Sequence, residues 1–287
     1  MMSVTKGKPA PGLYFISTPI GAARDITLRA LDLLTDADVI AAEDTRTLRH
    51  LMDIHGVALG DRPLLSYHDH NGAQVRPRIL AALAEGRSVV YASEAGTPLV
   101  ADPGYQLGRA AIEAGYPVIA APGPSAVLAA LTVSGLPSDR FMFAGFPPPT
   151  AAARRSWLME LQRLPATLIL YESPKRLNAL LTEIAACFGP DRQAVICREL
   201  TKRFEEVTRG TVDELIAAYA GRSVKGEIVV LIDRMHGEVT DTQTVEVAIK
   251  EALSCMSVKD AAGMVAEAMG LPRRQVYQIA LKLAAER

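Results

Sequence analysis

Residues 89–104 read Val-Val-Tyr-Ala-Ser-Glu-Ala-Gly-Thr-Pro-Leu-Val-Ala-Asp-Pro-Gly, and this stretch carries the strongest structural signal in the chain. Its first four residues are an apolar run typical of a buried strand, and a helical pattern begins near Tyr105. The Gly- and Pro-rich loop between them brings backbone N–H and C=O groups close to a ligand at the carboxyl end of a strand. The chain has neither Gly-x-x-x-x-Gly-Lys-Ser/Thr nor Gly-x-Gly-x-x-Gly, so we expect backbone contacts and shape, rather than a phosphate-binding loop, to hold that ligand.

The same alternation of apolar runs and helical patterns extends through the N-terminal part of the chain. Each apolar run is followed by a polar or Gly- and Pro-rich cluster, which predicts a parallel, doubly wound sheet with its site at the carboxyl edge. We assign residues 1–122 to this first α/β domain. The predicted strands are 13–16, 39–42, 64–67, 89–92 and 118–121.

A second α/β pattern fills residues 123–236 and predicts a domain with a mixed sheet. Residues 204–208 are expected to pair antiparallel with a neighbouring strand. Ser173 and Pro174 have the residue types of a helix N-cap and first helical position, for a helix that extends to about Cys187. The other predicted strands are 167–171, 194–197 and 227–233.

Residues 237–287 form a third segment, a polar linker over 238–244 followed by a helical tail. Ser257 and Asp260 have the spacing of an N-terminal capping signal, for a helix that ends at Gly270. Leu271-Pro272 then opens a helix through about Ala285. The pattern fits a helix-turn-helix and equally a helical hairpin packed on the body or on a second subunit.

Composition limits the class of protein. Of 287 residues, 49% are apolar and 5% aromatic, and the net charge of −1 gives no overall attraction for nucleic acid. The three cysteines have neither a pairing pattern nor metal-ligand spacing, which is typical of a reducing compartment. No signal peptide and no apolar run of about 18 residues is present, so we expect a cytoplasmic protein without a membrane span.

The motifs at the predicted strand ends, taken in order, resemble those of the tetrapyrrole methylases, a superfamily of S-adenosylmethionine (SAM)-dependent methyltransferases. Within it, the resemblance is to the branch that 2′-O-methylates a cytidine in 16S rRNA of the small ribosomal subunit. It implies a homodimer that binds SAM in a cleft between the two α/β domains. The matching stretches span residues 13 to about 233 and include 18–21, 42–46, 68–71, 95–98, 102–104, 122–126, 135–141, 171–173, 198–202 and 225–227.

The resemblance also assigns residues to the cofactor. Two positions depart from the family pattern: Glu94 stands where Asp is usual, and Ala22 where Asn is usual, so no ligand role is transferred to Ala22. The expected SAM-binding residues are Pro19, Glu94, Gly96, Thr97, Pro98, Ser125, Ala126, Tyr171, Glu199, Leu200, Glu227 and Ile228.

Methyl transfer to a ribose hydroxyl, a weak acid, calls for a hydrogen-bond acceptor or general base beside the hydroxyl. The candidates are Glu43, Asp44, His68, Asp69 and Glu199. Glu43, His68 and Asp69 are favoured, since Asp44 fits the N-cap of the helix that begins at Thr45. Two histidines and one carboxylate at 68–70 are a thin ligand set, and we predict no metal.

Local cations are needed to hold RNA, and an assembled ribosomal particle is the expected target. Two other functions stay open: methylation of a tetrapyrrole precursor, and a ligand-sensing DNA-binding regulator that uses the tail. Arg78, Arg154-Arg155 and, in the tail, Arg273, Arg274 and Lys282 are further cations that could contribute. The arginines expected to contact RNA phosphates are Arg24, Arg46, Arg49 and Arg76.

Overall fold

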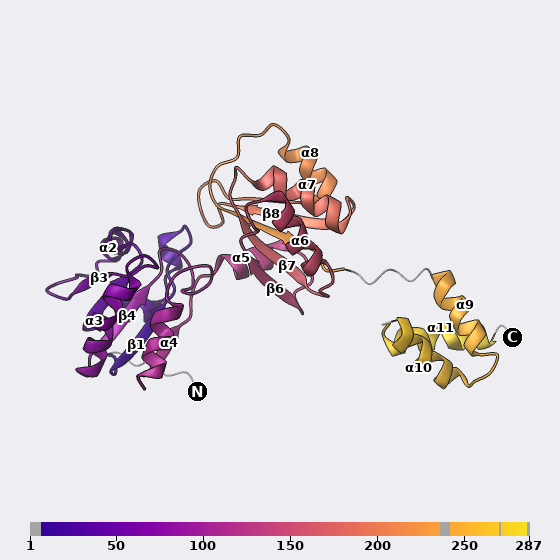
Figure 1. Ribbon diagram of the computed structural model, residues 1–287, viewed down its shortest axis with the longest axis horizontal. Helices are drawn as coiled ribbons and strands as arrows, with labels where there is room; N and C mark the ends of the chain where they lie inside the picture. The colour runs from indigo at the N-terminus through magenta and orange to yellow at the C-terminus, as the bar shows by residue number, and fades with distance from the viewer. Residues whose placement is uncertain (1–6, 236–241, 270, 286–287) are drawn as a thin grey trace. The chain divides into compact units, whose positions relative to one another are not determined.

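The computed structural model describes residues 7–235, 242–269 and 271–285, with the side chains of 242–244 left out. The chain divides into two compact units, residues 1–159 with 167–233, and residues 160–166 with 234–287. The first unit contains both sheets, and the second contains the C-terminal helices (Figure 1).

The first sheet confirms the predicted parallel, doubly wound topology. Its five strands are all parallel and lie in the order β3-β2-β4-β1-β5. Their carboxyl ends therefore meet at one edge, where the polar clusters follow the strands. The strands are β1 (Gly12–Ile16), β2 (Val39–Ala42), β3 (Leu64–Ser66), β4 (Ser88–Ala92) and β5 (Val118–Ala121).

Helices cover both faces of this sheet because alternate residues of its strands are apolar on both sides. In β1, Tyr14 and Ile16 pack into one core cluster, while Leu13 and Phe15 pack into another on the opposite face. The helices of this part of the unit are η1 (Ala23–Asp25), α1 (Leu28–Asp36), α2 (Thr45–Ile54), α3 (Gly72–Ala84) and α4 (Tyr105–Glu113).

The second sheet is mixed, as predicted, with strand order β6-β7-β10-β8-β9. β6 and β7 are parallel, and the other neighbours are antiparallel, including β8 with β9. Its strands are β6 (Phe141–Gly145), β7 (Thr167–Glu172), β8 (Gln193–Arg198), β9 (Glu206–Thr211) and β10 (Ile228–Ile232), and its helices are α5 (Ala126–Ser134), α6 (Ala151–Gln162), α7 (Leu177–Phe188) and α8 (Val212–Tyr219).

The predicted helix start at Ser173 is wrong. Helix α7 begins at Leu177, with Arg176 as its N-cap, because residues 173–176 form a separate turn in which the Arg176 N–H donates to the Ser173 carbonyl at 3.0 Å. The Arg176 guanidinium pairs with Glu172 at 3.2 Å, which fixes this turn beside the end of β7.

In its described residues the second unit holds three helices, one more than the sequence delimited, and has a core of its own. Ile249, Val276 and Ala280 are fully buried in it. Ser257 caps the middle helix, accepting the Asp260 N–H at 3.3 Å, as predicted. The predicted linker ends early because helix begins at Thr242; the rest of the linker and Gly270 lie outside the described residues. The helices are α9 (Thr242–Ala252), α10 (Val258–Met269) and α11 (Arg273–Ala285).

The domain boundaries at residues 122 and 236 stay predictions. In the part of the chain that the structure describes, no helix has the length and apolar character needed to cross a membrane.

Candidate active site

A cavity of about 440 Å³ lies in the first unit, bounded by elements of both sheets. The loop after β4 forms one side, and the ends of β7 and β8 with the start of β10 form the other. A volume of this size suits a ligand as large as a nucleoside derivative. Nine of the twelve residues predicted to bind the cofactor line this cavity: Glu94, Gly96, Thr97, Ser125, Ala126, Tyr171, Leu200, Glu227 and Ile228.

The loop after β4 is held in place by hydrogen bonds along its length. Gly96 pairs with Thr18 through two backbone hydrogen bonds of 2.9 Å, and the Thr97 hydroxyl donates to the Pro124 carbonyl at 2.9 Å. Leu99 and Ala101 adopt φ angles of +71° and +60°, which cost energy for residues with a side chain. Backbone strain of this kind persists where surrounding contacts fix it, and it concentrates at functional sites.

The chemistry of the lining is anionic and apolar. Four carboxylates line the cavity, and none of the described residues that line it is Lys or Arg. One wall is aromatic, since the ring of Tyr171 packs edge-on against Phe143 and Phe146, with centroids 4.7 and 5.5 Å apart. The cavity therefore suits a ligand with a cationic centre and a flat, apolar part. The lining carboxylates are Glu94, Asp102, Glu172 and Glu227.

Asp102 has an unusual protonation equilibrium. Burial raises the pKa of its carboxyl to about 7, assisted by the nearby carboxylates of Glu43, Glu94 and Glu227, while a hydrogen bond with Ser93 opposes the shift. Burial, with Asp102 and Glu227 nearby, likewise raises the pKa of Tyr171 to about 12. The cavity thus disfavours added negative charge before any ligand binds.

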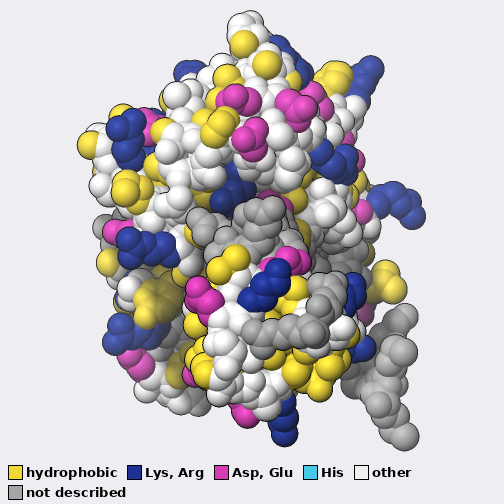
Figure 2. All heavy atoms as spheres, turned by 90° about the vertical axis from the view of Figure 1, so that its right-hand side faces the viewer, with side chains coloured by type: hydrophobic (Ala, Val, Ile, Leu, Met, Phe, Trp, Pro, Cys, Tyr) yellow, Lys and Arg dark blue, Asp and Glu magenta, His cyan; other side chains and the backbone are white. Residues whose placement is uncertain are grey.

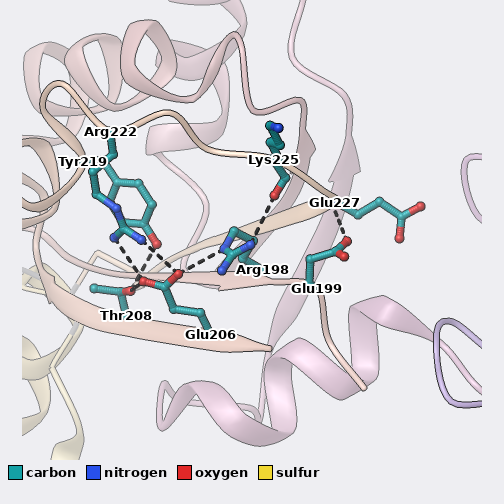
Figure 3. Close-up of polar contacts among 8 residues, drawn as sticks. All are labelled: Arg198, Glu199, Glu206, Thr208, Tyr219, Arg222, Lys225 and Glu227. Carbon is teal, nitrogen blue, oxygen red and sulfur yellow. Dashed lines mark hydrogen bonds and ion pairs between the residues drawn. The ribbon is translucent and has the colours of Figure 1, made fainter. Parts of the chain in front are cut away.

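Glu199 and Lys202 support the turn at Gly226 and Glu227 on the far side of the cavity, and Figure 3 draws the hydrogen bond between Glu199 and Glu227. The Glu227 N–H donates to Glu199 Oε1 at 3.0 Å, and the Glu199 N–H donates to the Glu227 carbonyl at 3.0 Å. Lys202 Nζ bridges the two carboxylates at 3.0 and 2.7 Å. Glu199 is therefore placed behind the lining, where it shapes the turn that contributes Glu227 and Ile228.

A second polar network braces the same turn through β8 and β9 (Figure 3). Glu206 accepts hydrogen bonds from Arg198 at 3.0 Å and from Arg222 at 3.0 and 3.2 Å. Arg198 also donates to the carbonyl of Lys225 at 3.3 Å. The Arg222 guanidinium and the Arg198 guanidinium hold the pKa of Glu206 below its usual range, although its partial burial opposes them.

Replacing Glu206 by alanine is expected to lower the free energy of unfolding by roughly 1–3 kcal/mol, because two arginines lose a charged partner. The matched control is Glu85→Ala, which breaks the ion pair with Arg87, a pair of more exposed side chains expected to contribute less than about 1 kcal/mol. Urea denaturation of both variants measures the difference. Equal losses would show that the Glu206 network contributes no more than a surface pair.

Three predicted cofactor residues do not line the cavity. Pro98 lines a separate, largely apolar cavity beside α4 and β5. Pro19 follows Thr18 of the Gly96 bridge, and Glu199 lies in the support described above. Sequence reasoning in turn missed Asp102 and Glu172, although both belong to stretches that carried the family resemblance. The signal in each case was a carboxylate near a strand end. Glu172 is the last residue of β7, and Asp102 lies in the loop after β4.

The three favoured candidate bases lie outside the lining. Glu43 comes nearest, since its Oε2 accepts the Glu94 N–H at 3.1 Å. His68 and His70 stack edge-on with centroids 5.9 Å apart, and Asp69 is exposed. Asp44 caps α2, accepting the N–H groups of Arg46 and Thr47 at 2.7 and 3.2 Å, as predicted. Among the described residues, no three His, Cys, Asp or Glu side chains are grouped to hold a metal ion.

The predicted RNA-binding arginines lie near the carboxyl edge of the first sheet and differ in their exposure and in their partners. Arg24, Arg46 and Arg49 are exposed, although Arg46 pairs with Asp44 at 2.8 Å. Arg76 is half-buried, and its Nε donates to the Tyr67 hydroxyl at 3.4 Å.

Surface charge outside these arginines is mixed. Arg154 is not a surface cation, because it is buried and donates to the carbonyls of Pro148 and Pro149 at 3.4 Å. On the face drawn in Figure 2, Lys/Arg and Asp/Glu side chains are interspersed. Among the described residues drawn on that face, no large patch of one sign is visible.

Residues 12–216 match the family described as Tetrapyrrole (Corrin/Porphyrin) Methylases. Residues 239–284 match a second family, described as RsmI C-terminal HTH domain. The first match covers the first sheet and strands β6 to β9 of the second, and the second match covers helices α9 to α11 apart from the last residue of α11.

Curated relatives cover nearly the whole chain. "Ribosomal RNA small subunit methyltransferase I" of Mesorhizobium japonicum is 44% identical over 95% of this chain and 92% of its own. The proteins of the same name from Xylella fastidiosa and Escherichia coli O157:H7 are 43% and 40% identical, over 93% and 94% of this chain and 98% and 94% of their own.

Solved structures share the fold. Cobalt precorrin-4 methyltransferase, described as a cobalamin biosynthetic enzyme, has a TM-score of 0.58 at 21% identity, covering 77% of this chain and 94% of its own. Uroporphyrin-III C-methyltransferase from Thermus thermophilus, complexed with S-adenosyl homocysteine, has a TM-score of 0.52 at 20% identity over 78% and 97%. At these identities the likeness shows the fold alone.

Proposed function

Because the chain belongs to the tetrapyrrole methylase family, and within it to the ribosomal RNA small subunit methyltransferase I group, we propose that it 2′-O-methylates a cytidine of 16S rRNA. Membership makes it a SAM-dependent methyltransferase. The observation that supports the proposal most directly is the cavity at the strand ends, lined by main-chain loops, an aromatic wall and four carboxylates.

The residues of the cavity fit SAM. Its sulfonium and ammonium groups are cations, which the lining carboxylates favour, and its adenosine is flat and largely apolar, like the wall formed by Phe146 and Tyr171. Gly96 and Gly226 expose backbone on opposite sides of the cavity, where a bulky side chain would reduce the space. When bound, SAM supplies an electrophilic methyl carbon.

The protein contributes chiefly by positioning the acceptor ribose and excluding water. The rigid loop after β4 and the braced turn at Gly226 limit the orientations that a ligand can adopt between them. Holding the reacting groups in a productive orientation supplies much of the rate enhancement, and removal of the hydroxyl proton supplies a further part.

The curated relatives argue against a tetrapyrrole precursor as substrate. Those that cover nearly the whole chain, at 40–44% identity, are named ribosomal RNA small subunit methyltransferase I. A DNA-binding regulator is disfavoured because the family match over residues 12–216 and the curated relatives are those of methyltransferases.

RNA would be held by the exposed arginines near the sheet edge, chiefly Arg24, Arg46 and Arg49, with Arg76 beside them. So few cations predict modest affinity for naked RNA, with a salt dependence of only a few charges. We therefore propose that the enzyme acts on the assembled small subunit, where the shape of the particle adds to the binding.

The experiment that tests this function is methyl transfer from labelled SAM to small subunits isolated from a strain lacking the protein, followed by nucleotide mapping. We expect one methyl group on a cytidine ribose of 16S rRNA. Transfer to naked 16S rRNA should be much weaker. Label on a base, or absence of label from the subunits, would contradict the proposal.

We also propose that the chain acts as a homodimer in the cytoplasm, where small subunits are assembled. In support, α4 presents Tyr105 and Ile112, 58% and 64% exposed, beside the apolar cavity that includes Pro98. Exposed apolar side chains next to an apolar groove are typical of a subunit interface. Light scattering measures the mass, and a monomer at micromolar concentration would contradict this part.

A further inference from the structure

The carboxyl group of Asp102 is distinguished from the other carboxylates of the cavity by its surroundings. It lies on the strained loop after β4, directly following Ala101 with its φ of +60°, and it lines the cavity. The loop is fixed on both sides of it, through the Gly96 pairing with Thr18 and through the Tyr91 hydroxyl, which donates to the Pro103 carbonyl at 3.3 Å.

The other lining carboxylates are exposed or already engaged. Glu172 pairs with Arg176 at 3.2 Å and accepts the Ser173 N–H at 2.7 Å. The side chain of Glu227 is 74% exposed and pairs with Lys202. Glu94 is exposed at the rim. Asp102 is half-buried and forms no ion pair among the described residues, and apart from a hydrogen bond with Ser93 its carboxylate is available to a ligand.

We propose that Asp102 is the catalytic residue that accepts the proton of the ribose 2′-hydroxyl. This inference rests on the proposed 2′-O-methyltransferase function. The 2′-oxygen forms its new bond to the methyl carbon, the carbon–sulfur bond breaks, and its electron pair remains on sulfur, which yields S-adenosylhomocysteine. The hydroxyl proton passes to a carboxylate oxygen of Asp102 and from there to solvent.

Electrostatics suit Asp102 to this role. The groups that face it are the carboxylates of Glu43, Glu94 and Glu227, the hydroxyl of Ser93, and the rings of Tyr91 and Tyr171. Burial, assisted by the three carboxylates, makes it a better proton acceptor than an ordinary aspartate, and its pKa of about 7 is close to that of an efficient base at neutral pH. A bound sulfonium has the opposite effect on its protonation, favouring the ionised form that accepts a proton.

The test compares Asp102→Asn with the wild type, with Asp61→Asn, an exposed aspartate remote from the cavity, as the matched control. Asparagine keeps the shape and removes the proton acceptor. With saturating SAM and small subunits, we expect kcat to fall 10²–10⁴-fold in Asp102→Asn and to stay within twofold in the control. The rise of wild-type kcat with pH should be absent from the variant.

A second measurement needs no turnover. Calorimetry of SAM binding at pH 7, in buffers of different ionisation enthalpy, measures the protons released. We expect the wild type and the Asp61→Asn control to release up to about half a proton with SAM and less with S-adenosylhomocysteine, which has no sulfonium. Asp102→Asn should bind SAM and release correspondingly fewer protons.

The outcomes separate the two proposals. If wild-type enzyme methylates the small subunit but Asp102→Asn keeps a kcat within threefold, or if proton release is equal in the two, the role of Asp102 is overturned and the proposed function stands. If the wild type transfers no methyl group to small subunits, the proposed function fails and this inference fails with it. Circular dichroism of the variant confirms that it is folded.

Discussion

Gly226→Ala is expected to weaken SAM binding at least tenfold and to lower the free energy of unfolding by roughly 2–4 kcal/mol. Gly226 has a φ of +93°, a conformation that residues with a side chain rarely adopt. A Cβ built on it would also overlap the carboxylate of Glu199, which the braced turn holds in place. Relief of that overlap requires either Glu199 or the turn to move.

Movement of this turn displaces part of the cavity wall. Gly226, Glu227 and Ile228 all line it, and Glu227 exchanges two backbone-directed hydrogen bonds with Glu199. A shift of a few tenths of an ångström there changes the position of the wall that faces the loop after β4. Calorimetric titration with SAM and urea denaturation measure the two expected losses.

Gly221→Ala provides the control. Gly221 also has a positive φ, of +68°, but a Cβ there meets no atom within 4 Å, and the residue does not line the cavity. This variant should lose about 1–2 kcal/mol of stability from backbone strain and bind SAM as the wild type does. If Gly226→Ala bound SAM as tightly as Gly221→Ala, the support of the cavity by Glu199 would be refuted.

The strands of the first sheet and all but β6 of the second could be predicted because their apolar runs are short and end in Gly, Pro or polar clusters. Alternation of strand and helix then favoured the parallel topology of the first sheet. Prediction failed at Ser173, where the types of residue fit a helix start, because the Arg176 guanidinium, which pairs with Glu172, also donates to the distant Pro148 carbonyl at 3.0 Å and favours a separate turn. A pattern of single residues carries no information on such a contact.

The site was predicted less completely than the fold. Nine expected cofactor residues meet in one cavity because each follows or begins a strand or helix at the same edge. The placement of Glu199 behind the lining depends on its φ of +51° and on the approach of Gly226, which sequence spacing does not reveal. No role was predicted for Asp102, because its raised pKa depends on burial in the folded chain and on Glu43 and Glu227, which are remote from it in the sequence.

The protonation of Asp102 predicts how stability depends on pH in the ligand-free protein. Its pKa is about 7 in the folded state against 3.8 for the ordinary group, so the folded state binds more protons than the unfolded state between these values. The free energy of unfolding therefore falls as pH rises from about 4 to about 7. The loss is absent below this window and complete above it.

Asp102→Asn removes this penalty, so the ligand-free variant should be more stable than the wild type at pH 8, by on the order of 2 kcal/mol, and equally stable at pH 4. The figure is less than the full shift would give, since the cavity is open to solvent. Asp38 and Asp44, whose pKa values are lowered to about 2 chiefly by hydrogen bonds with Lys8 and Arg46, destabilise both proteins equally on acidification and cancel in the comparison.

Thermal denaturation of the ligand-free wild type and variant from pH 4 to pH 8 measures this difference. A gap that stays constant with pH would contradict the assignment, because a packing effect of the amide is independent of protonation. Addition of SAM should narrow the gap at pH 8, since its cation stabilises the ionised carboxylate that the empty cavity disfavours. The ionised Asp102 carboxylate would then lower stability in the ligand-free protein and interact favourably with the bound cation. This combination is expected of a site that serves function at the expense of stability.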